Sequence, residues 1–212
     1  MKTTLRGNLM LLTAALVWGM SFVSQSVGMR YVESFTFNGI RFLLGGLVLL
    51  PVIRLLDKTS GRSQLPAGEL SAIRKSSVRA GIFCGLVLFI ASTLQQQGIL
   101  TSTAGKAGFI TTLYIVIVPL LRSLGGKRLP LRIWLCVLAA LAGFLLLCVK
   151  ESLSISRGEL LLLCCAVMYS VHILVIDRCN GERVDGVRLS ATQFLVCGVL
   201  SLIGMVLFNT PT

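Results

Sequence analysis

Seven long apolar runs limit what this chain of 212 residues can fold into. A helix needs roughly 20 apolar residues to cross the hydrocarbon core of a bilayer, and a soluble protein can bury one or two such runs but not seven. Charged residues make up only 13% of the chain, against about 25% in soluble domains. The sequence therefore predicts an all-α polytopic bundle of membrane helices over residues 9–27, 35–56, 78–98, 103–124, 131–149, 158–177 and 189–208.

Two other interpretations of the apolar runs fit the chain less well. The first run follows Lys2 and Arg6, as in a secretory signal peptide, but it is followed by six further runs and by no small-x-small cleavage site. Strands of an outer-membrane barrel are about ten residues long and alternate in polarity, whereas these runs are longer and do not alternate. We therefore interpret all seven as membrane helices.

The distribution of the net charge of +12 predicts the topology. If the amino terminus is cytoplasmic, the inner segments hold fifteen Lys and Arg residues and the outer loops hold three, Arg30, Lys150 and Arg157. Cytoplasmic loops of membrane proteins are enriched in Lys and Arg in this way. We therefore predict a multi-pass protein of the cell membrane with a cytoplasmic amino terminus, and the charge calls for no nucleic-acid partner. The inner residues are Lys2, Arg6, Arg54, Lys58, Arg62, Arg74, Lys75, Arg79, Arg122, Lys127, Arg128, Arg132, Arg178, Arg183 and Arg188.

An internal repeat relates the first and sixth predicted helices. RGNLMLLTAALVWGMSF (6–22) aligns without a gap with RGELLLLCCAVMYSVHI (157–173), at an offset of 151 residues. Because five helices separate the two starts, the copies cross the membrane in opposite directions, which is the inverted-repeat architecture of many secondary transporters. We predict a first repeat of five helices over 1–150 and the first two helices of a second repeat over 157–212. We expect the remaining helices either to follow in a longer chain or to come from elsewhere.

Polar residues inside the predicted spans recur at helical spacing. Such side chains are costly in a bilayer and usually face a bundle interior or a watery cavity. The stripes are Trp18, Ser21 and Gln25; Asn38, Arg41 and Gly45; Thr103, Lys106, Ile110 and Tyr114; and Tyr169, His172 and Ile176. We expect one of Gln95, Gln96 and Gln97 to face inward as well. We predict a substrate cavity whose binding residues are Trp18, Gln25, Asn38, Arg41, Lys106, Tyr114, Tyr169 and His172.

Four of these residues have a structural alternative that the sequence leaves open. Lys106 lies near the outer end of its helix and could extend its ammonium group to the lipid headgroups. Arg41 could pair with Glu33 instead of facing a cavity. His172 could be a hydrogen-bonded packing residue, and Trp18 could pack in the interior or anchor the helix at the membrane interface.

Small residues and cysteines in the spans point to helix packing. Gly81 with Gly85, Gly105 with Gly108, and Ala139 with Gly143 predict seams at which helices approach closely. The seven cysteines have no CxxC or zinc-ligand spacing, so we interpret them as small buried apolar residues. They are Cys84, Cys136, Cys148, Cys164, Cys165, Cys179 and Cys197.

The sequence offers little for catalysis or for proton coupling. GxSxG, HExxH and paired intramembrane aspartates are missing, and a single histidine limits acid–base and metal chemistry. We therefore predict no enzyme activity, no metal site and no cofactor. No Asp or Glu is predicted deep in a span, so no carboxylate is visible for proton coupling. A retinal-type receptor needs a lysine in its seventh helix, and residues 189–208 contain none.

Several stretches resemble the EamA-type proteins of the drug/metabolite transporter superfamily. The most specific is TAGKAGFITTLYIVIVP (103–119) followed by GGKRLPLRIWLCVLAALAGFLLL (125–147). ALVWGMSFV (15–23) and FNGIRFLLGGLVLLP (37–51) resemble the opening of that family. The resemblance implies ten helices in two inverted five-helix repeats around a central substrate cavity, and export of small metabolites, amino acids or drugs. The chain departs from this pattern by supplying seven helices of the ten.

The sequence therefore predicts a membrane transporter that works by alternating access between two inverted repeats. Lys106 and Arg41 are at similar depths in their helices. Because a desolvated cation gains most from an opposite charge, we expect the pair to favour a small-molecule substrate with an anionic group, a zwitterion included. The alternatives are a non-transporting truncated remnant or, from other classes, a membrane-embedded receptor or enzyme.

Overall fold

The computed structural model describes residues 2–59, 66–124, 129–149, 155–179, 181 and 184–208. Every regular element in these residues is a helix, which confirms the predicted all-α fold. The helices are α1 (Lys2–Gly28), α2 (Ser34–Thr59), α3 (Ala67–Leu100), α4 (Ala104–Thr112), α5 (Tyr114–Ser123), α6 (Leu131–Val149), α7 (Arg157–Cys179) and α8 (Gly186–Phe208). The basic residues Arg62, Lys127, Arg128, Lys150 and Arg183 lie outside the described residues, so their predicted sides stay predictions.

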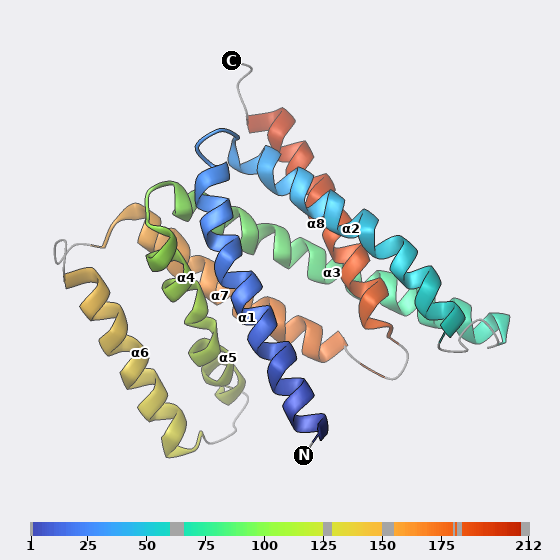
Figure 1. Ribbon diagram of the computed structural model, residues 1–212, viewed down its shortest axis with the longest axis horizontal. Coiled ribbons are helices and arrows are strands. Elements are labelled where there is room, and N and C mark those ends of the chain that lie inside the picture. Colours follow the sequence, from blue (N-terminus) through green and yellow to red (C-terminus); the bar gives the residue numbers. More distant parts are fainter. Residues whose placement is uncertain are drawn as a thin grey trace.

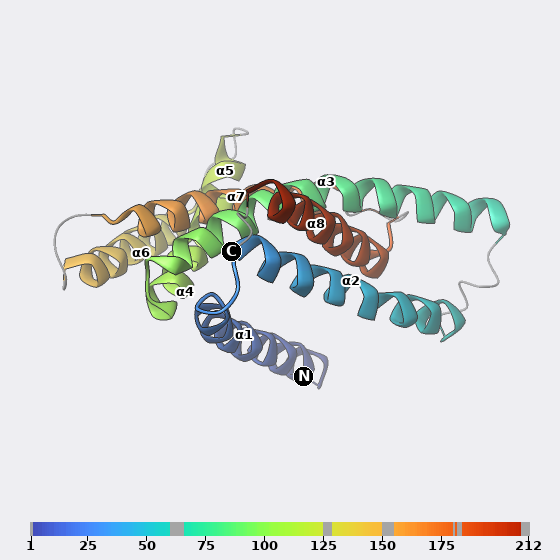
Figure 2. The same ribbon diagram turned by 90° about the horizontal axis from the view of Figure 1, so that it is seen from above.

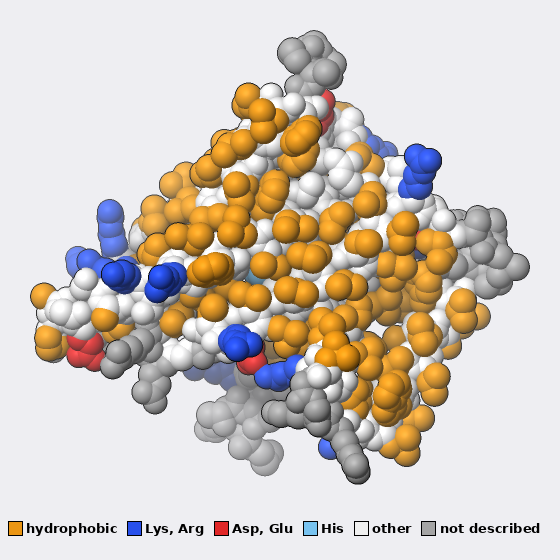
Figure 3. All heavy atoms as spheres, turned by 180° about the vertical axis from the view of Figure 1, so that it is seen from behind, with side chains coloured by type: hydrophobic (Ala, Val, Ile, Leu, Met, Phe, Trp, Pro, Cys, Tyr) orange, Lys and Arg blue, Asp and Glu red, His pale blue; other side chains and the backbone are white. Residues whose placement is uncertain are grey.

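The helices confirm a multi-pass membrane protein. Six segments are long and apolar enough to cross a bilayer: Leu5–Gly28 of α1, Ala104–Ser123 of α4 and α5 together, and all of α2, α3, α7 and α8. The apolar part of α6, Leu131–Leu146, is shorter. Figure 3 shows apolar side chains spread over a whole face of the molecule, with Lys and Arg mostly toward its margins. A surface of this kind suits contact with lipid, and each of the seven predicted runs is helical, the fourth as the two helices α4 and α5.

The fourth predicted helix is divided in two at Leu113, although α4 and α5 continue one another in Figure 1. The Leu113 N–H donates to the carbonyl of Ile110 at 3.1 Å, the i→i−3 pattern of a tighter turn. Pro119 has no N–H for the carbonyl of Ile115, and its ring crowds that carbonyl. Discontinuous helices of this kind form substrate sites in many transporters, and Tyr114 is the first residue after the break.

α3 is longer than the sequence predicts. It begins at Ala67, whereas the predicted span begins at residue 78. The segment follows Pro66, carries Glu69 in its first turn and is rich in good helix formers. The 34 residues of α3 extend about 51 Å at 1.5 Å per residue, against a hydrocarbon core of about 30 Å. The first turns of α3 therefore lie outside the apolar layer or require a tilted helix.

Close contacts hold α3 against α7 and α8 in the middle of the bundle, while α1 and α6 lie at its margins (Figures 1 and 2). A Cβ atom on Gly81 would lie 2.5 Å from the side chain of Thr192 on α8, and a Cβ atom on Gly85 would lie 2.8 Å from Val196. Real side chains do not approach so closely, so α3 and α8 meet at a distance that only glycine allows. The predicted seam at Gly81 and Gly85 is confirmed.

The other predicted packing residues have mixed outcomes. A Cβ atom on Gly143 would lie 2.8 Å from the ring of Phe109, whereas Gly105 has no neighbour within 4 Å. The seam is wrong at Gly105 because α4 packs instead through Ala107 and Ile110. Among the cysteines, Cys84, Cys165 and Cys197 are buried as predicted, but Cys136 and Cys164 lie on exposed helix surfaces and the side chain of Cys148 lies outside the described part of the chain.

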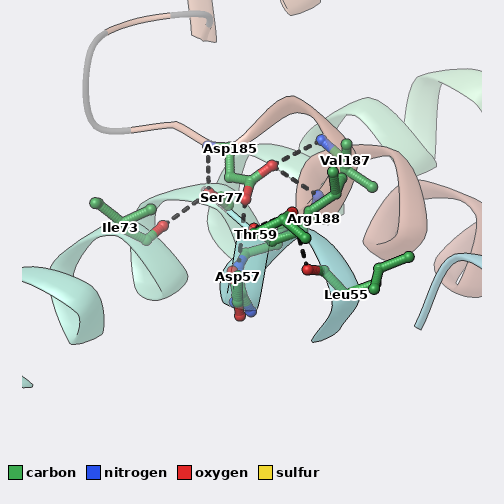
Figure 4. Close-up of polar contacts among 9 residues, drawn as sticks. Leu55, Asp57, Thr59, Ile73, Ser77, Asp185, Val187 and Arg188 are labelled. Carbon is green, nitrogen blue, oxygen red and sulfur yellow. Dashed lines mark hydrogen bonds and ion pairs between the residues drawn. The ribbon is translucent and has the colours of Figure 1, made fainter. Parts of the chain in front are cut away.

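A polar network joins α2, α3 and α8 at the predicted inner end of the bundle (Figure 4). Arg188, in the first turn of α8, forms an ion pair with Asp57 near the end of α2 and lies 3.5 Å from the Asp185 carboxylate. The Asp185 N–H donates to Ser77 Oγ of α3 at 2.8 Å, and its carboxylate accepts from the Val187 N–H at 2.9 Å. Three helices are therefore tied together where α8 begins.

Candidate functional site

A cavity of about 550 Å³ lies between the helices near the middle of the bundle. Residues of α1, α2, α3, α5, α7 and α8 form its wall. Its size is within the range of small-molecule sites, roughly 300–1,000 Å³. The lining residues are Trp18, Ser21, Gln25, Arg41, Phe42, Gly45, Leu88, Gln95, Tyr114, Tyr169, His172, Ile173, Ile176, Gln193 and Phe194.

Six of the eight predicted binding residues line this cavity. They are Trp18, Gln25, Arg41, Tyr114, Tyr169 and His172. Asn38 lies one turn before Arg41 on α2 and is fully buried, with its Oδ1 atom accepting a hydrogen bond from Arg41 Nη2 at 2.9 Å. Asn38 therefore positions the guanidinium group and does not itself line the cavity.

Lys106 is the exception among the predicted residues. Its Nζ atom lies 3.0 Å from Glu159 Oε1, and the two side chains are only 11% and 5% exposed. Lys106 therefore joins α4 to α7, and it neither lines the cavity nor extends to the headgroups. The pairing with Glu159 therefore removes Lys106 from the hypothesis of an anion-binding pair.

Glu159 is held by the start of its own helix as well as by Lys106. It accepts from the Ser156 N–H at 2.9 Å, while its own N–H lies 3.2 Å from Ser156 Oγ. These reciprocal bonds form a capping box, whose signature Ser-x-x-Glu is present in the sequence at 156–159. The same signature marks a carboxylate that the sequence analysis overlooked, at the first turn of a predicted span.

Arg41 has no carboxylate partner among the described residues. Its guanidinium carbon lies 4.7 Å from the centre of the Phe42 ring and 5.5 Å from that of Phe37. Its Nε atom is buried without a hydrogen-bond partner in the described part of the chain, and Asn38, not Glu33, is the residue that it contacts. Arg41 is of intermediate exposure, and a partly desolvated cation without a counter-ion is costly, so this wall of the cavity favours an anion.

Uncharged polar groups surround the rest of the cavity. Gln25 donates to Ser21 Oγ at 2.7 Å and accepts from Gln96 at 3.0 Å, while the Tyr169 hydroxyl donates to Gln95 Oε1 at 3.2 Å. Gln95 lines the cavity, and Gln96 is fully buried as well, so two members of the Gln95–Gln97 run face inward where one was predicted. No group of three or more His, Cys, Asp or Glu side chains in the described ranges could hold a metal ion. The site can bind by hydrogen bonds, by aromatic contact and by one positive charge.

Gln193 and Phe194 of α8 line the cavity, and the sequence analysis missed both. A signal for them exists, because RFLLGG (41–46) aligns with QFLVCG (193–198) at an offset of 152 residues. Arg41 then corresponds to Gln193 and Phe42 to Phe194. The correspondence is hard to recognise in the sequence, because α8 is largely apolar and a single glutamine, Gln193, is a weak signal.

Contacts between α2 and α8 follow the same correspondence. The rings of Phe42 and Phe194 lie 5.7 Å apart. A Cβ atom on Gly46 would lie 2.8 Å from Leu195, and one on Gly198 would lie 2.8 Å from Leu43. Each contact is thus the counterpart of the other, as across an axis of approximate two-fold symmetry.

The chain is similar in sequence to known transporter proteins. The chain matches the EamA-like transporter family over residues 5–149, which cover α1 to α6. A protein of Archaeoglobus fulgidus described as an uncharacterized transporter is 29% identical over 174 residues, which are 82% of this chain and 49% of the relative. The chain therefore spans about half the length of the curated relative it matches. No solved structure matches the chain.

Proposed function

Because this chain belongs to the EamA-like transporter family, we propose that it carries small organic molecules with an anionic group across the membrane through the cavity beside Arg41. The observation that carries the proposal is the partly buried guanidinium group, which has an amide partner but no carboxylate partner among the described residues. A carboxylate, sulfonate or phosphate group in the cavity can accept hydrogen bonds from the guanidinium Nη atoms of Arg41, which lines the cavity. Such charge-assisted hydrogen bonds are about twice as strong as neutral ones.

The rest of the cavity wall supports a substrate with an apolar body. The Trp18 and Tyr114 rings lie 6.4 Å apart, and the Phe42 and Phe194 rings lie 5.7 Å apart. Aromatic faces of this kind bury apolar surface with little loss of side-chain entropy. A zwitterion also fits this wall, because ring faces and amide oxygens accept a cationic group. Small metabolites, amino acids and drugs of this chemistry are the proposed substrates.

We extend the proposal to alternating access between two inverted repeats, over 1–150 and from 157 onward. The reciprocal contacts of Gly46 and Gly198 support it, because they relate a helix of one proposed repeat to a helix of the other. Residues that correspond at offsets of 151 and 152 also face the same cavity: Trp18 with Tyr169, and Arg41 with Gln193. A binding site at the axis between repeats is the arrangement that lets one repeat rock against the other.

Export from the cytoplasm across the cell membrane is the direction that the family resemblance implies. The predicted cytoplasmic amino terminus agrees with the basic residues that lie at one end of the described helices, among them Arg54, Arg74 and Arg122.

Binding to the purified chain tests the proposal directly. Trp18 lines the cavity and Trp134 lies on exposed α6, so a Trp134→Phe chain in lipid nanodiscs reports ligand binding through Trp18 fluorescence. We expect hexanesulfonate, a permanent anion, to bind more tightly than neutral hexanamide. Arg41→Gln should weaken hexanesulfonate binding about 10- to 100-fold, the loss expected for a charge-assisted bond, and leave hexanamide unchanged.

The matched control is Arg74→Gln, because Arg74 is exposed on α3 and is not one of the cavity-lining residues. It removes the same charge and should leave hexanesulfonate binding unchanged. Uptake of labelled hexanesulfonate into proteoliposomes above the level of empty vesicles then measures transport. Equal binding by the Arg41→Gln and Arg74→Gln chains would refute the role of Arg41.

A further inference from the structure

We infer that Gln193 and His172 form a neutral hydrogen-bonding group in the wall of the Arg41 cavity, which favours, among the proposed substrates, those with a single anionic group and a second, uncharged hydrogen-bonding group. This inference rests on the proposed transport of anionic molecules and deepens it, because it names the second recognition element of the same cavity. The substrate class is an organic monoanion with an apolar body and a separate hydroxyl, carbonyl or amide group.

Gln193 and His172 are buried in the cavity wall and bonded to one another. Gln193 is 6% exposed and His172 is 7% exposed, and both line the cavity. Gln193 Oε1 lies 3.0 Å from His172 Nε2. A buried imidazole and a buried amide thus satisfy one another and stay in place on the cavity wall.

The amide nitrogen of Gln193 is available to a ligand. It has no hydrogen-bond partner among the described residues, yet it is not among their sealed, unsatisfied polar atoms. It is therefore accessible from the cavity, while the Gln193 oxygen is engaged by His172. An accessible amide N–H donates, so it calls for an acceptor on the ligand.

Gln193 of α8 corresponds to Arg41 of α2. Gln193 occupies in QFLVCG the place that Arg41 occupies in RFLLGG, and the neighbouring rings of Phe42 and Phe194 are in contact. Two equivalent positions on neighbouring helices thus contribute a cation and an amide to the wall of one cavity. A dianion would bury its second charge against an amide, and an unpaired buried charge is costly. A neutral acceptor suits that place better.

A ligand series of constant length tests this on the unaltered cavity. The probes are hexanesulfonate, 6-hydroxyhexanesulfonate and 1,6-hexanedisulfonate, with binding followed by Trp18 fluorescence in the Trp134→Phe chain. We expect the hydroxyl compound to bind about tenfold more tightly than hexanesulfonate, as one added buried hydrogen bond allows. The disulfonate should bind more weakly than the hydroxyl compound. Equal affinity for all three, or preference for the disulfonate, would overturn the inference without any variant.

Two substitutions assign the preference to Gln193. Gln193→Met keeps the volume of the side chain and removes the donor, so it should abolish the tenfold advantage of the hydroxyl compound and leave hexanesulfonate binding within twofold. Gln193→Arg introduces a cation at the place equivalent to Arg41, so the disulfonate should become the tightest ligand of the series. A purely structural role of Gln193 predicts instead that Gln193→Met weakens all three ligands equally.

Different results would refute this inference and the proposed function on which it rests. If Arg41→Gln leaves hexanesulfonate binding unchanged, the proposed function fails. If Arg41→Gln weakens binding but Gln193→Met leaves the ratio of hydroxyl compound to hexanesulfonate unchanged, this inference alone is refuted.

Discussion

Breaking the Lys106–Glu159 pair should strongly destabilise the bundle. The two side chains are 11% and 5% exposed and their charged atoms lie 3.0 Å apart, so Lys106→Met leaves a buried carboxylate without its cation. Removing one partner of a buried pair costs about 3–5 kcal/mol. Adding Glu159→Gln should recover much of this loss, because no charge then remains buried and the glutamine can still accept from the Ser156 N–H.

Arg122 and Asp177 provide the matched control, because they join α5 to the same helix α7. Their side chains are 58% and 57% exposed, and exposed pairs contribute only about 0–1 kcal/mol. Arg122→Met should therefore have little effect. The measurement is loss of far-ultraviolet helical signal of the purified chain on titration with denaturant in micelles, for single and double variants of both pairs.

The result that would refute this reasoning is a similar loss for both pairs, since burial would then not decide the cost. A second readout tests the location of Lys106 against the cavity role that the sequence suggested. Lys106→Gln should leave hexanesulfonate binding within twofold of the parent chain. A loss as large as that of Arg41→Gln would return Lys106 to the cavity.

Three further predictions follow from the packing, the polar network and the charge distribution. Gly198→Val places side-chain atoms against Leu43 and should cost about 1–3 kcal/mol in the same denaturant titration, whereas Gly19→Val, with no neighbour within 4 Å, should not. Asp57→Asn weakens the bond to Arg188 and should lower stability by about 1–3 kcal/mol, so a loss no greater than that of an exposed carboxylate would contradict the role of this network. Reporter fusions at the connections should be cytoplasmic after the second and fourth spans and external after the fifth, and the reverse pattern would refute the predicted topology; suitable sites are Thr59, Leu124 and Ile155.

Much of the fold is predictable from the sequence because a bilayer leaves few choices. Backbone groups in hydrocarbon must be satisfied within each segment, so a long apolar run such as 158–177 becomes a helix whatever surrounds it. Helical spacing then predicts which residues share one face of a helix. Trp18, Tyr169 and His172 were assigned to polar faces in this way, and all three line one cavity. The seam at Gly81 was predictable for the same reason, since small residues at helical spacing mark a face that approaches a neighbour.

The limits of the prediction have physical causes as well. Spacing assigns a residue to a face but does not say which helix that face meets. Lys106 therefore pairs with Glu159, 53 residues away, instead of reaching the stripe partner Tyr114 or the headgroups. The break at Leu113 falls within one continuous apolar run, and a hydrophobicity pattern gives no indication of it.

The sequence by itself determined the class of the molecule: an α-helical protein of the membrane, with one deeply placed arginine among polar and aromatic residues. Those features follow from local composition and from the length of each apolar run, because a bilayer requires such a run to be helical. Only the tertiary structure decided that Arg41 meets an amide and no carboxylate among the described residues, that Gln193 faces the same cavity, and that Lys106 is neutralised by Glu159. Each of these depends on which helices lie side by side, because the energy of a buried charge is set by the groups that surround it in space.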